Sequence, residues 1–266
     1  MQLHPSMIQH VGSHSRSYDA PQLKYLGSPI PLYGQVPSWK RGVKRAFDIV
    51  FSLVALGFFA CLLPFLALAI KLESRGPVFY GQIRVGINRR GRERRREQSQ
   101  APEIGERRCQ QQSRDVRRVI AEGRPFKIWK LRTMYINSES EGMRWASEND
   151  PRITRVGRFL RLTRIDEFPQ FYNVLRGSMS VVGPRPERPP FISLLSREVP
   201  GYLERLRFKP GITGLAQVES GYDESLDSVH KKVALDLEYI TRFGLLRDLR
   251  LLVATVRVVI TGRGAL

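Results

Sequence analysis

The segment from Ile49 to Ile70, IVFSLVALGFFACLLPFLALAI, restricts the fold more than any other part of the 266-residue chain. It contains no charged residue, and about 20 apolar residues in a helix are enough to cross the hydrocarbon core of a bilayer. A long, mostly polar stretch precedes it, unlike the start of a secretory signal peptide. No polar face interrupts the run, so a buried core helix is the less favoured alternative. We therefore predict a membrane anchor over residues 41–75.

Two details of the anchor favour a segment that enters and leaves the membrane on one side. Pro64 lies inside the run, where proline removes a helix hydrogen bond and bends the axis. Basic residues flank both ends: Arg41, Lys44, Arg45, Lys71 and Arg75. Since basic flanks favour the cytoplasmic side, both ends are expected there. We predict a re-entrant helix broken at the proline, with a full span as the alternative.

A second apolar pattern lies near the C-terminus, in LLRDLRLLVATVRVVI from Leu245 to Ile260. Leu245, Leu249, Leu252, Val256 and Val259 recur at helical spacing. An amphipathic helix of this kind can lie in the plane of the membrane interface. Packing of the same stripe on the protein core is an equally favoured alternative.

The charge of the chain points to an anionic partner. It carries 44 Lys and Arg against 25 Asp and Glu, a net charge of +19. Nucleic acid, acidic lipid and a phosphorylated substrate all fit such a charge. Residues 88–122 form an arginine-rich stretch that we interpret as a solvated insertion able to bind anionic headgroups. No aromatic residues alternate with its arginines, so nucleic acid is not the expected partner.

The remaining composition sets simple bounds. Residues 1–40 lack sustained periodicity and are expected to form a flexible tail. The two cysteines, Cys61 and Cys109, have no CxxC pattern or nearby histidine, which disfavours a zinc site or a disulfide framework and suits a reducing compartment.

Residues 76–266 are expected to form one mixed α/β, helix-rich domain. Strands are predicted within Gly76–Gly86 and Gly123–Met134, and a helical stretch within Ser138–Trp145. A cationic helix follows, in which Arg155, Arg158, Arg161 and Arg164 recur every three residues.

Directly after this helix come two adjacent acids, Asp166 and Glu167. We predict that Asp166 caps a helix with Pro169 in its first turn, and that Gly177 ends this helix. Nearby arginines are expected to lower the pKa of Asp166 by about 1–3 units. An ionised carboxylate can attack phosphorus, and its neighbour can hold Mg²⁺ on the phosphates. The alternative is that both acids serve only the helix start.

Several cations are expected to face these acids. Arg185 lies between Pro184 and Pro186, which restrict the backbone and so aim the guanidinium, a group suited to phosphate. Lys130 and Arg132 add two cations beside a predicted strand. A solvated basic surface explains any one of them, but it explains a convergent set less well.

These segments resemble, in order, those of the bacterial sugar transferases, the small monotopic phosphoglycosyl transferases. The matching segments are KRAFDIV, Pro64 in the apolar run, IKLESRGPVFYGQIRVG, PFKIWKLRTM, DPRITRVGRFLRLTRIDEFPQFYNVLRGSMSVVGPRPE and KPGITGLAQV. The resemblance covers the chain from about Lys44 onward. The longer tail and the arginine-rich insertion depart from the family pattern, but neither removes a motif residue.

The resemblance implies transfer of a sugar-1-phosphate from a UDP-sugar to polyprenyl phosphate, with release of UMP and with Mg²⁺ as cofactor. It implies Asp166 as the nucleophile and Glu167 as a magnesium ligand. It further implies that Lys130, Arg161 and Arg185 contact phosphates, with Arg132 as a weaker candidate.

The resemblance also implies a place in the cell. It places a small catalytic domain on the cytoplasmic face of the bacterial inner membrane. There it would open exopolysaccharide, O-antigen or other glycoconjugate assembly and supply later glycosyltransferases. The alternatives are a membrane-tethered basic binding protein and a metal-dependent phosphoester hydrolase.

Overall fold

The computed structural model describes residues 33–87, 123–136, 138, 150–220 and 226–261. The elements, in which η marks a 3-10 helix, are η1 Tyr33–Gln35, α2 Ser38–Glu73, β1 Phe79–Gly86, β2 Arg124–Leu131, α4 Arg155–Leu162, η3 Ile165–Gln170, α5 Phe171–Leu175, β3 Ser180–Val182, α6 Pro189–Glu198, η4 Tyr202–Arg207, β4 Gly211–Thr213, α7 Leu215–Glu219, α8 Leu226–Thr241 and α9 Leu245–Thr261. The expected mixed, helix-rich architecture is confirmed. The predicted insertion 88–122, helical stretch 138–145 and most of the tail lie outside the described residues.

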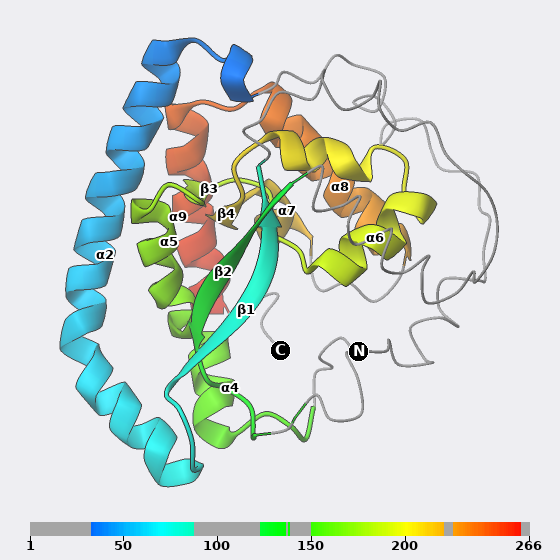
Figure 1. The fold of residues 1–266 in the computed structure, drawn as a ribbon. Helices are drawn as coiled ribbons and strands as arrows, with labels where there is room; N and C mark the ends of the chain where they lie inside the picture. The colour runs from blue at the N-terminus through cyan, green and yellow to red at the C-terminus, as the bar shows by residue number, and fades with distance from the viewer. Residues whose placement is uncertain (1–32, 88–122, 137, 139–149, 221–225, 262–266) are drawn as a thin grey trace.

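Helix α2 is one continuous helix of 36 residues that follows a bowed path along one side of the molecule (Figure 1). It passes through Pro64 without interruption, so the predicted separation into two helices is wrong. Among the described residues it is the one helix long and apolar enough to cross a membrane. Little of its apolar window is covered by the protein, since only 11% of that window is buried.

One narrow face of α2 is polar and faces the domain. Lys44, Asp48 and Ser52 follow one another at intervals of four residues and are all buried. Lys44 Nζ donates to Asp248 Oδ2 of α9 at 2.6 Å and to the Val182 carbonyl at 3.1 Å. Asp48 Oδ1 accepts from the Ser180 hydroxyl and from the Val181 amide, each at 3.0 Å. These contacts fix the anchor to the rest of the domain.

Basic residues in the first half of α2 therefore bind groups within the protein. Arg45 donates to the carbonyls of Val174 and Leu175 at 2.5 and 2.6 Å, which are two of the last carbonyls of α5. Lys44 and Arg45 are thus not simple membrane flanks, and the charge argument for a re-entrant anchor is weaker than the sequence suggests. The fold also begins earlier than residue 41, because Val36 is buried in the core.

Strands β1 and β2 form an antiparallel ribbon that runs across the front of the molecule in Figure 1. The register pairs Phe79 with Leu131 at one end and Gly86 with Arg124 at the other. Both strands predicted from the sequence are present, shortened at their ends. Tyr80 is paired with Lys130, which places Lys130 near the end of β2 that leads toward the acids.

Two side chains accept hydrogen bonds from the backbone amides in the first turn of helix α4. The Thr154 hydroxyl accepts from the Gly157 amide at 2.8 Å, and the Glu73 carboxylate accepts from the amides of Arg155 and Val156 at 2.6 and 2.8 Å. The end of α2 thus caps α4. Gly157 is needed because an added Cβ would lie 2.1 Å from the Thr133 carbonyl oxygen.

The chain leaves α4 through Arg164, whose φ of 58° is left-handed and unusual for a residue with a side chain. Asp166 and Glu167 therefore lie in the first turn of η3. The prediction that Asp166 caps the helix is wrong, because Arg164 occupies the N-cap position. The predicted stop at Gly177 is confirmed. Its amide donates to the Val174 carbonyl and the Ser178 amide to the Asn173 carbonyl, which closes α5 with a Schellman motif.

The main core lies behind the ribbon, where β3 pairs in parallel with β4 and α5, α6 and α8 pack around them. Fully buried members include Val174, Val182, Ile192, Leu237 and Ile240. A smaller cluster joins α2 to β2 and α4 through Phe59, Ile70, Leu131 and Leu160. Each acid of η3 is thus carried on a segment held between two packed clusters.

Helix α9 packs on the domain through one face, and contact of its other face with a membrane stays a prediction. Asp248 and Leu251 face the core and are buried. A stripe on the opposite side is exposed: Leu246, Leu249, Val253, Val256 and Ile260. One face of α9 therefore packs on the domain, and the other is apolar and uncovered among the described residues.

Candidate functional site

The two acids form the centre of the candidate site. Asp166 and Glu167 are each only 5% exposed, although they lie in a 3-10 turn between two helices. Lys130 Nζ of β2 donates to Glu167 Oε1 at 2.6 Å, and Arg185 Nη2 donates to the same oxygen at 2.9 Å. Asp166 Oδ2 lies 3.7 Å from Lys130 Nζ. Cations from two segments distant in sequence thus converge on adjacent carboxylates, as the sequence predicted.

Different surroundings push the pKa values of the two acids in opposite directions. Burial alone would raise the pKa of Glu167, but Arg185 and Lys130 outweigh burial and hold that pKa well below 4.5. Burial dominates at the neighbouring acid and raises the pKa of Asp166 above 3.8, and the negative charge of Glu167 adds to this effect. Arg161 and Arg164 do act to lower the pKa of Asp166, but burial outweighs them, so the predicted net lowering is wrong. Lys130 binds Glu167 more closely, so it leaves Asp166 less stabilised as an anion.

Two further predicted residues occupy different places. Arg161 of α4 donates from Nε to the Thr133 hydroxyl at 3.0 Å and is close enough to Asp166 to favour its charged form. Arg132 is turned away from the acids. Its guanidinium donates to the carbonyls of Arg75 and Ser74, the latter at 2.6 Å, just after α2. Arg132 therefore stabilises the exit from the anchor, and its predicted contact with substrate has no support in the geometry.

Arg164 belongs to the site, although the sequence pattern alone assigned it no role beyond the row of arginines in α4. The three-residue spacing places it in the row of α4 arginines, but α4 ends at Leu162 and the left-handed backbone at Arg164 takes it out of that row. Its positive charge favours the ionised forms of both Asp166 and Glu167. The position of Arg164 two residues before Asp166 was a signal in the sequence. The direction of its side chain, however, depends on a left-handed backbone conformation that the sequence does not specify.

An apolar groove of about 590 Å³ opens beside these residues, between α2 and α9. Its walls include Val54 and Phe58 of α2 and Leu252 and Val256 of α9. Arg164, Glu167 and Arg185 also line it. The groove therefore brings a long apolar surface and a charged site into contact within one hollow.

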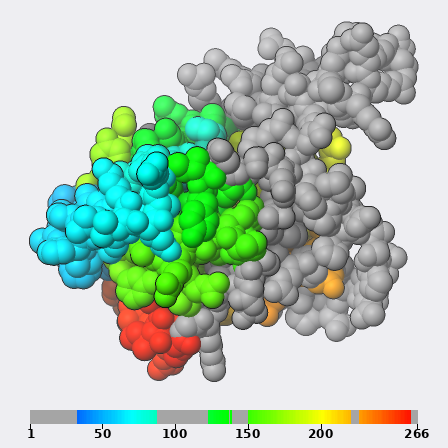
Figure 2. Space-filling model, turned by 90° about the horizontal axis from the view of Figure 1, so that it is seen from below, coloured from blue at the N-terminus to red at the C-terminus, as the bar shows by residue number. Residues whose placement is uncertain are grey.

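The helices beside the groove expose large apolar side chains on one face. The end of α2, the α4 region and the end of α9 adjoin one another there (Figure 2). The exposed side chains are Phe65, Leu68, Leu72, Phe159, Leu162, Val256 and Ile260. An apolar surface of this extent is typical of a protein that contacts a membrane.

Comparison with known proteins places this geometry in a family. The family model described as bacterial sugar transferase matches residues 39–96 and 110–262, which include the anchor, the acids and all the cations described above.

Individual relatives agree with the family match. The chain is 38% identical over 242 residues to a UDP-N-acetylgalactosamine-undecaprenyl-phosphate N-acetylgalactosaminephosphotransferase of Aeromonas hydrophila, covering 90% of this chain and 48% of that protein. It is 36% identical over 230 residues to the UDP-glucose:undecaprenyl-phosphate glucose-1-phosphate transferase of Escherichia coli K12, covering 85% of this chain and 42% of that protein.

A relative of similar size is the exopolysaccharide production protein PSS of Rhizobium leguminosarum, 36% identical over 220 residues, which cover 80% of this chain and 93% of that protein. The chain spans less than half the length of the Aeromonas and Escherichia proteins. The family model covers both the site and the anchor. This chain belongs to the bacterial sugar transferase family.

Proposed function

We propose that the protein transfers a sugar-1-phosphate from a UDP-sugar to undecaprenyl phosphate or a similar polyprenyl phosphate, with release of UMP. One observation carries this proposal: a buried pair of acids, held by cations, adjoins an apolar groove, and Glu167 of the pair lines that groove. One substrate is soluble and anionic, and the other combines a phosphate with a long hydrocarbon chain. A hollow that joins charged and apolar walls suits both. The names of the relatives support the same pair of substrates.

Asp166 is the proposed nucleophile. Its carboxylate attacks the phosphorus that carries the sugar, the bond from this phosphorus to the oxygen of UMP breaks, and UMP leaves with that electron pair. The sugar phosphate is then held on Asp166 as an acyl phosphate. A phosphate oxygen of the lipid attacks the same phosphorus, the bond to Asp166 breaks, and the carboxylate is restored. Asp166 suits this role better than Glu167 because the two short ion-pair contacts are both on Glu167.

The cations have separate proposed tasks. Arg185 and Arg164 line the groove beside Glu167, where they would bind the phosphates of donor and lipid. Lys130 bridges the two acids at 2.6 and 3.7 Å and would keep them oriented. Arg161, held by Thr133, would add positive charge near Asp166.

The residues present fit a magnesium ion held jointly with substrate. Among the described residues no group of three or more potential protein ligands exists. Mg²⁺ needs only one or two carboxylates when substrate phosphates supply the other oxygens. Glu167 is the proposed ligand, because both of its cation contacts are to Oε1. When bound, Mg²⁺ would neutralise charge on the diphosphate.

The exposed apolar face supports a position on the cytoplasmic membrane of a bacterium, with α2 as the anchor and the site facing the cytoplasm, where UDP-sugars occur. A re-entrant path for α2 remains part of this proposal. The product would open exopolysaccharide, O-antigen or another glycoconjugate pathway and pass to later glycosyltransferases.

Purified protein in nanodiscs tests the reaction. It is incubated with a panel of UDP-sugars, undecaprenyl phosphate and Mg²⁺, and products are separated by chromatography. Lipid-linked sugar together with UMP is expected for at least one donor. Free sugar phosphate without lipid product would indicate a hydrolase instead. No product from any donor, with polymer binding that is lost at high salt, would favour a basic binding protein.

A further inference from the structure

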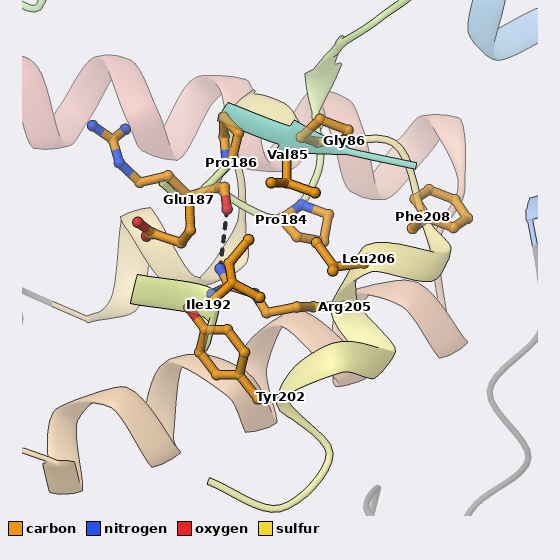
Figure 3. A pocket seen from close by; sticks show the side chains of 12 residues that line it. Val85, Gly86, Pro184, Pro186, Glu187, Ile192, Tyr202, Arg205, Leu206 and Phe208 are labelled. Atoms are coloured by element: carbon orange, nitrogen blue, oxygen red, sulfur yellow. Dashed lines mark hydrogen bonds between the residues drawn. The ribbon is translucent and has the colours of Figure 1, made fainter. Parts of the chain in front are cut away.

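The turn that carries Arg185 is held through its carbonyl groups. Every carbonyl from Pro184 to Glu187 accepts a hydrogen bond, and the donors are the Gly211 amide at 2.8 Å, Arg205 Nη2 at 3.1 Å, Arg84 Nη1 at 2.9 Å and the Val85 amide at 3.0 Å. Pro184 and Pro186 have no N–H, so this turn depends on acceptor contacts more than most turns do. Figure 3 shows the side chains around it and the bond from Arg205 to the Arg185 carbonyl.

The side chain of Arg205, one of these four donors, is itself held in place by contacts with other residues. It lies in η4 and is buried, and its Nη2 atom also lies 2.6 Å from Asp236 Oδ2 of α8. One nitrogen therefore contacts both a buried carboxylate and the carbonyl of the residue that reaches Glu167. The Tyr202 ring lies against the guanidinium, with its centre 5.2 Å from Arg205 Cζ, and further limits the movement of the Arg205 side chain.

The Arg205–Asp236 pair itself does not line the apolar groove that adjoins the acids. Its path to the site runs from α8 through η4 to the backbone of Arg185, and from the Arg185 side chain to Glu167 at 2.9 Å. Burial raises the pKa of Asp236 to about 6 against the attraction of Arg205, so at neutral pH the carboxylate is charged and holds the guanidinium.

We propose that Arg205 and Asp236 are positioning residues that set the direction of Arg185 for the donor phosphates. This rests on the proposed function, in which Arg185 binds phosphate. A buried ion pair has a large desolvation cost and often contributes little net stability. The charge-assisted contact from Arg185 to the donor phosphates stabilises the bound donor, so a displaced Arg185 weakens donor binding. The pair therefore matters more for the Michaelis constant of the donor than for folding.

The test separates these two effects by removing the pair as a unit. A single change would leave a buried charge without its partner and destabilise the protein. The double variant Arg205→Met/Asp236→Leu replaces the pair with apolar side chains of similar size. We expect a melting temperature close to wild type and a KM for the UDP-sugar raised about 10-fold or more, because a contact to a charged phosphate is weakened. A merely structural role would lower the folded fraction and hence apparent kcat, with KM unchanged.

Arg207→Met is the matched control. Arg207 lies on the same short helix, is only partly buried, and pairs with Glu204 at 2.5 Å. We expect wild-type KM for this variant. A wild-type KM in the folded double variant would overturn the positioning role. If the double variant does not fold, Arg205→Lys decides, because its ammonium ends short of Nη2 while it keeps the charge opposite Asp236. Wild-type KM there would overturn the role equally, and a raised KM would support it.

Arg185→Gln distinguishes this inference from the function on which it rests. If Arg185→Gln raises the KM for the donor and the double variant does not, only the positioning role fails. If Arg185→Gln itself leaves KM unchanged, the proposed phosphate contact fails first. Should both hold, adding Arg205→Met/Asp236→Leu to Arg185→Gln is expected to raise KM less than twofold further, since the residue being positioned is already gone.

Discussion

At the scale of single residues, Asp166 and Glu167 show how neighbours in sequence acquire different chemistry. Both are equally buried, yet only Glu167 accepts close hydrogen bonds from two cations. Burial raises the pKa of one and the cations lower that of the other. Environments that shift the pKa values of two neighbouring carboxylates in opposite directions are a recurring basis for separate catalytic roles.

The variant Asp166→Asn tests this assignment. We expect the rate of lipid-linked product formation to fall on the order of 1000-fold or more, because an amide cannot take the phosphosugar. Sedimentation with membranes should be unchanged, since Asp166 is buried and is not part of the exposed apolar surface. Near-normal transfer by this variant would remove Asp166 from the nucleophile role.

Asp236 gives a prediction about pH and stability. Burial raises the pKa of this acid from 3.8 to about 6, so the folded state binds its proton more tightly than the unfolded chain. The resulting stability is complete below pH ~4 and is lost as pH rises to ~6; a difference of about two pKa units corresponds to roughly 3 kcal/mol. We expect the melting temperature of wild type relative to Asp236→Asn to fall by several degrees between pH ~4 and pH ~7. A difference that stays constant over this range would contradict the assignment.

At the scale of elements, the groove between α2 and α9 connects the anchor to the chemistry. Asp248 of α9 pairs with Lys44 of α2 at one end, and apolar side chains from both helices line the groove farther along. The salt bridge sets the spacing of the two helices, and the hollow they leave is open to the exposed apolar face.

The variant Val256→Asp tests whether the groove holds the lipid substrate. Val256 is exposed and lines the groove, so a carboxylate there should raise the KM for undecaprenyl phosphate about 10-fold or more and leave the KM for the UDP-sugar unchanged. Leu246→Asp is the control, because Leu246 is exposed on the same helix but does not line this groove. Equal effects of the two changes would show that only general membrane contact was lost.

At the scale of the whole molecule, the path of α2 through the membrane decides how the site is placed. Lys40 and Arg75 lie just inside and just beyond the two ends of α2 and are both exposed. Single cysteines at these positions, in a chain with Cys61 and Cys109 replaced by serine, are expected to react with an impermeant maleimide from the same side. Gly76 is unsuitable, because its φ of 126° and the nearby Arg132 exclude a side chain. Labelling from opposite sides would show a span.

The sequence predicts the features of this molecule that depend on residues close together along the chain better than those that depend on partners far apart in the sequence. The long apolar helix, the paired strands and the acids with Lys130 and Arg185 follow from local patterns and from the family motifs. The roles of Lys44, Arg132 and Arg205 do not, since their partners are Asp248, the carbonyls just after α2, and Asp236. The pKa of Asp166 was mispredicted for the same reason: arginines nearby in sequence were counted, while burial depends on the whole fold.

The central claim is that Asp166 carries the phosphosugar during turnover. Enzyme in nanodiscs is incubated with a competent UDP-sugar and Mg²⁺ without polyprenyl phosphate, quenched in acid and digested for mass spectrometry. The account predicts that the peptide containing Asp166 gains the mass of one sugar phosphate, that Asp166→Asn does not, and that added undecaprenyl phosphate discharges the adduct. An active enzyme whose Asp166 peptide keeps its unmodified mass under these conditions would contradict it.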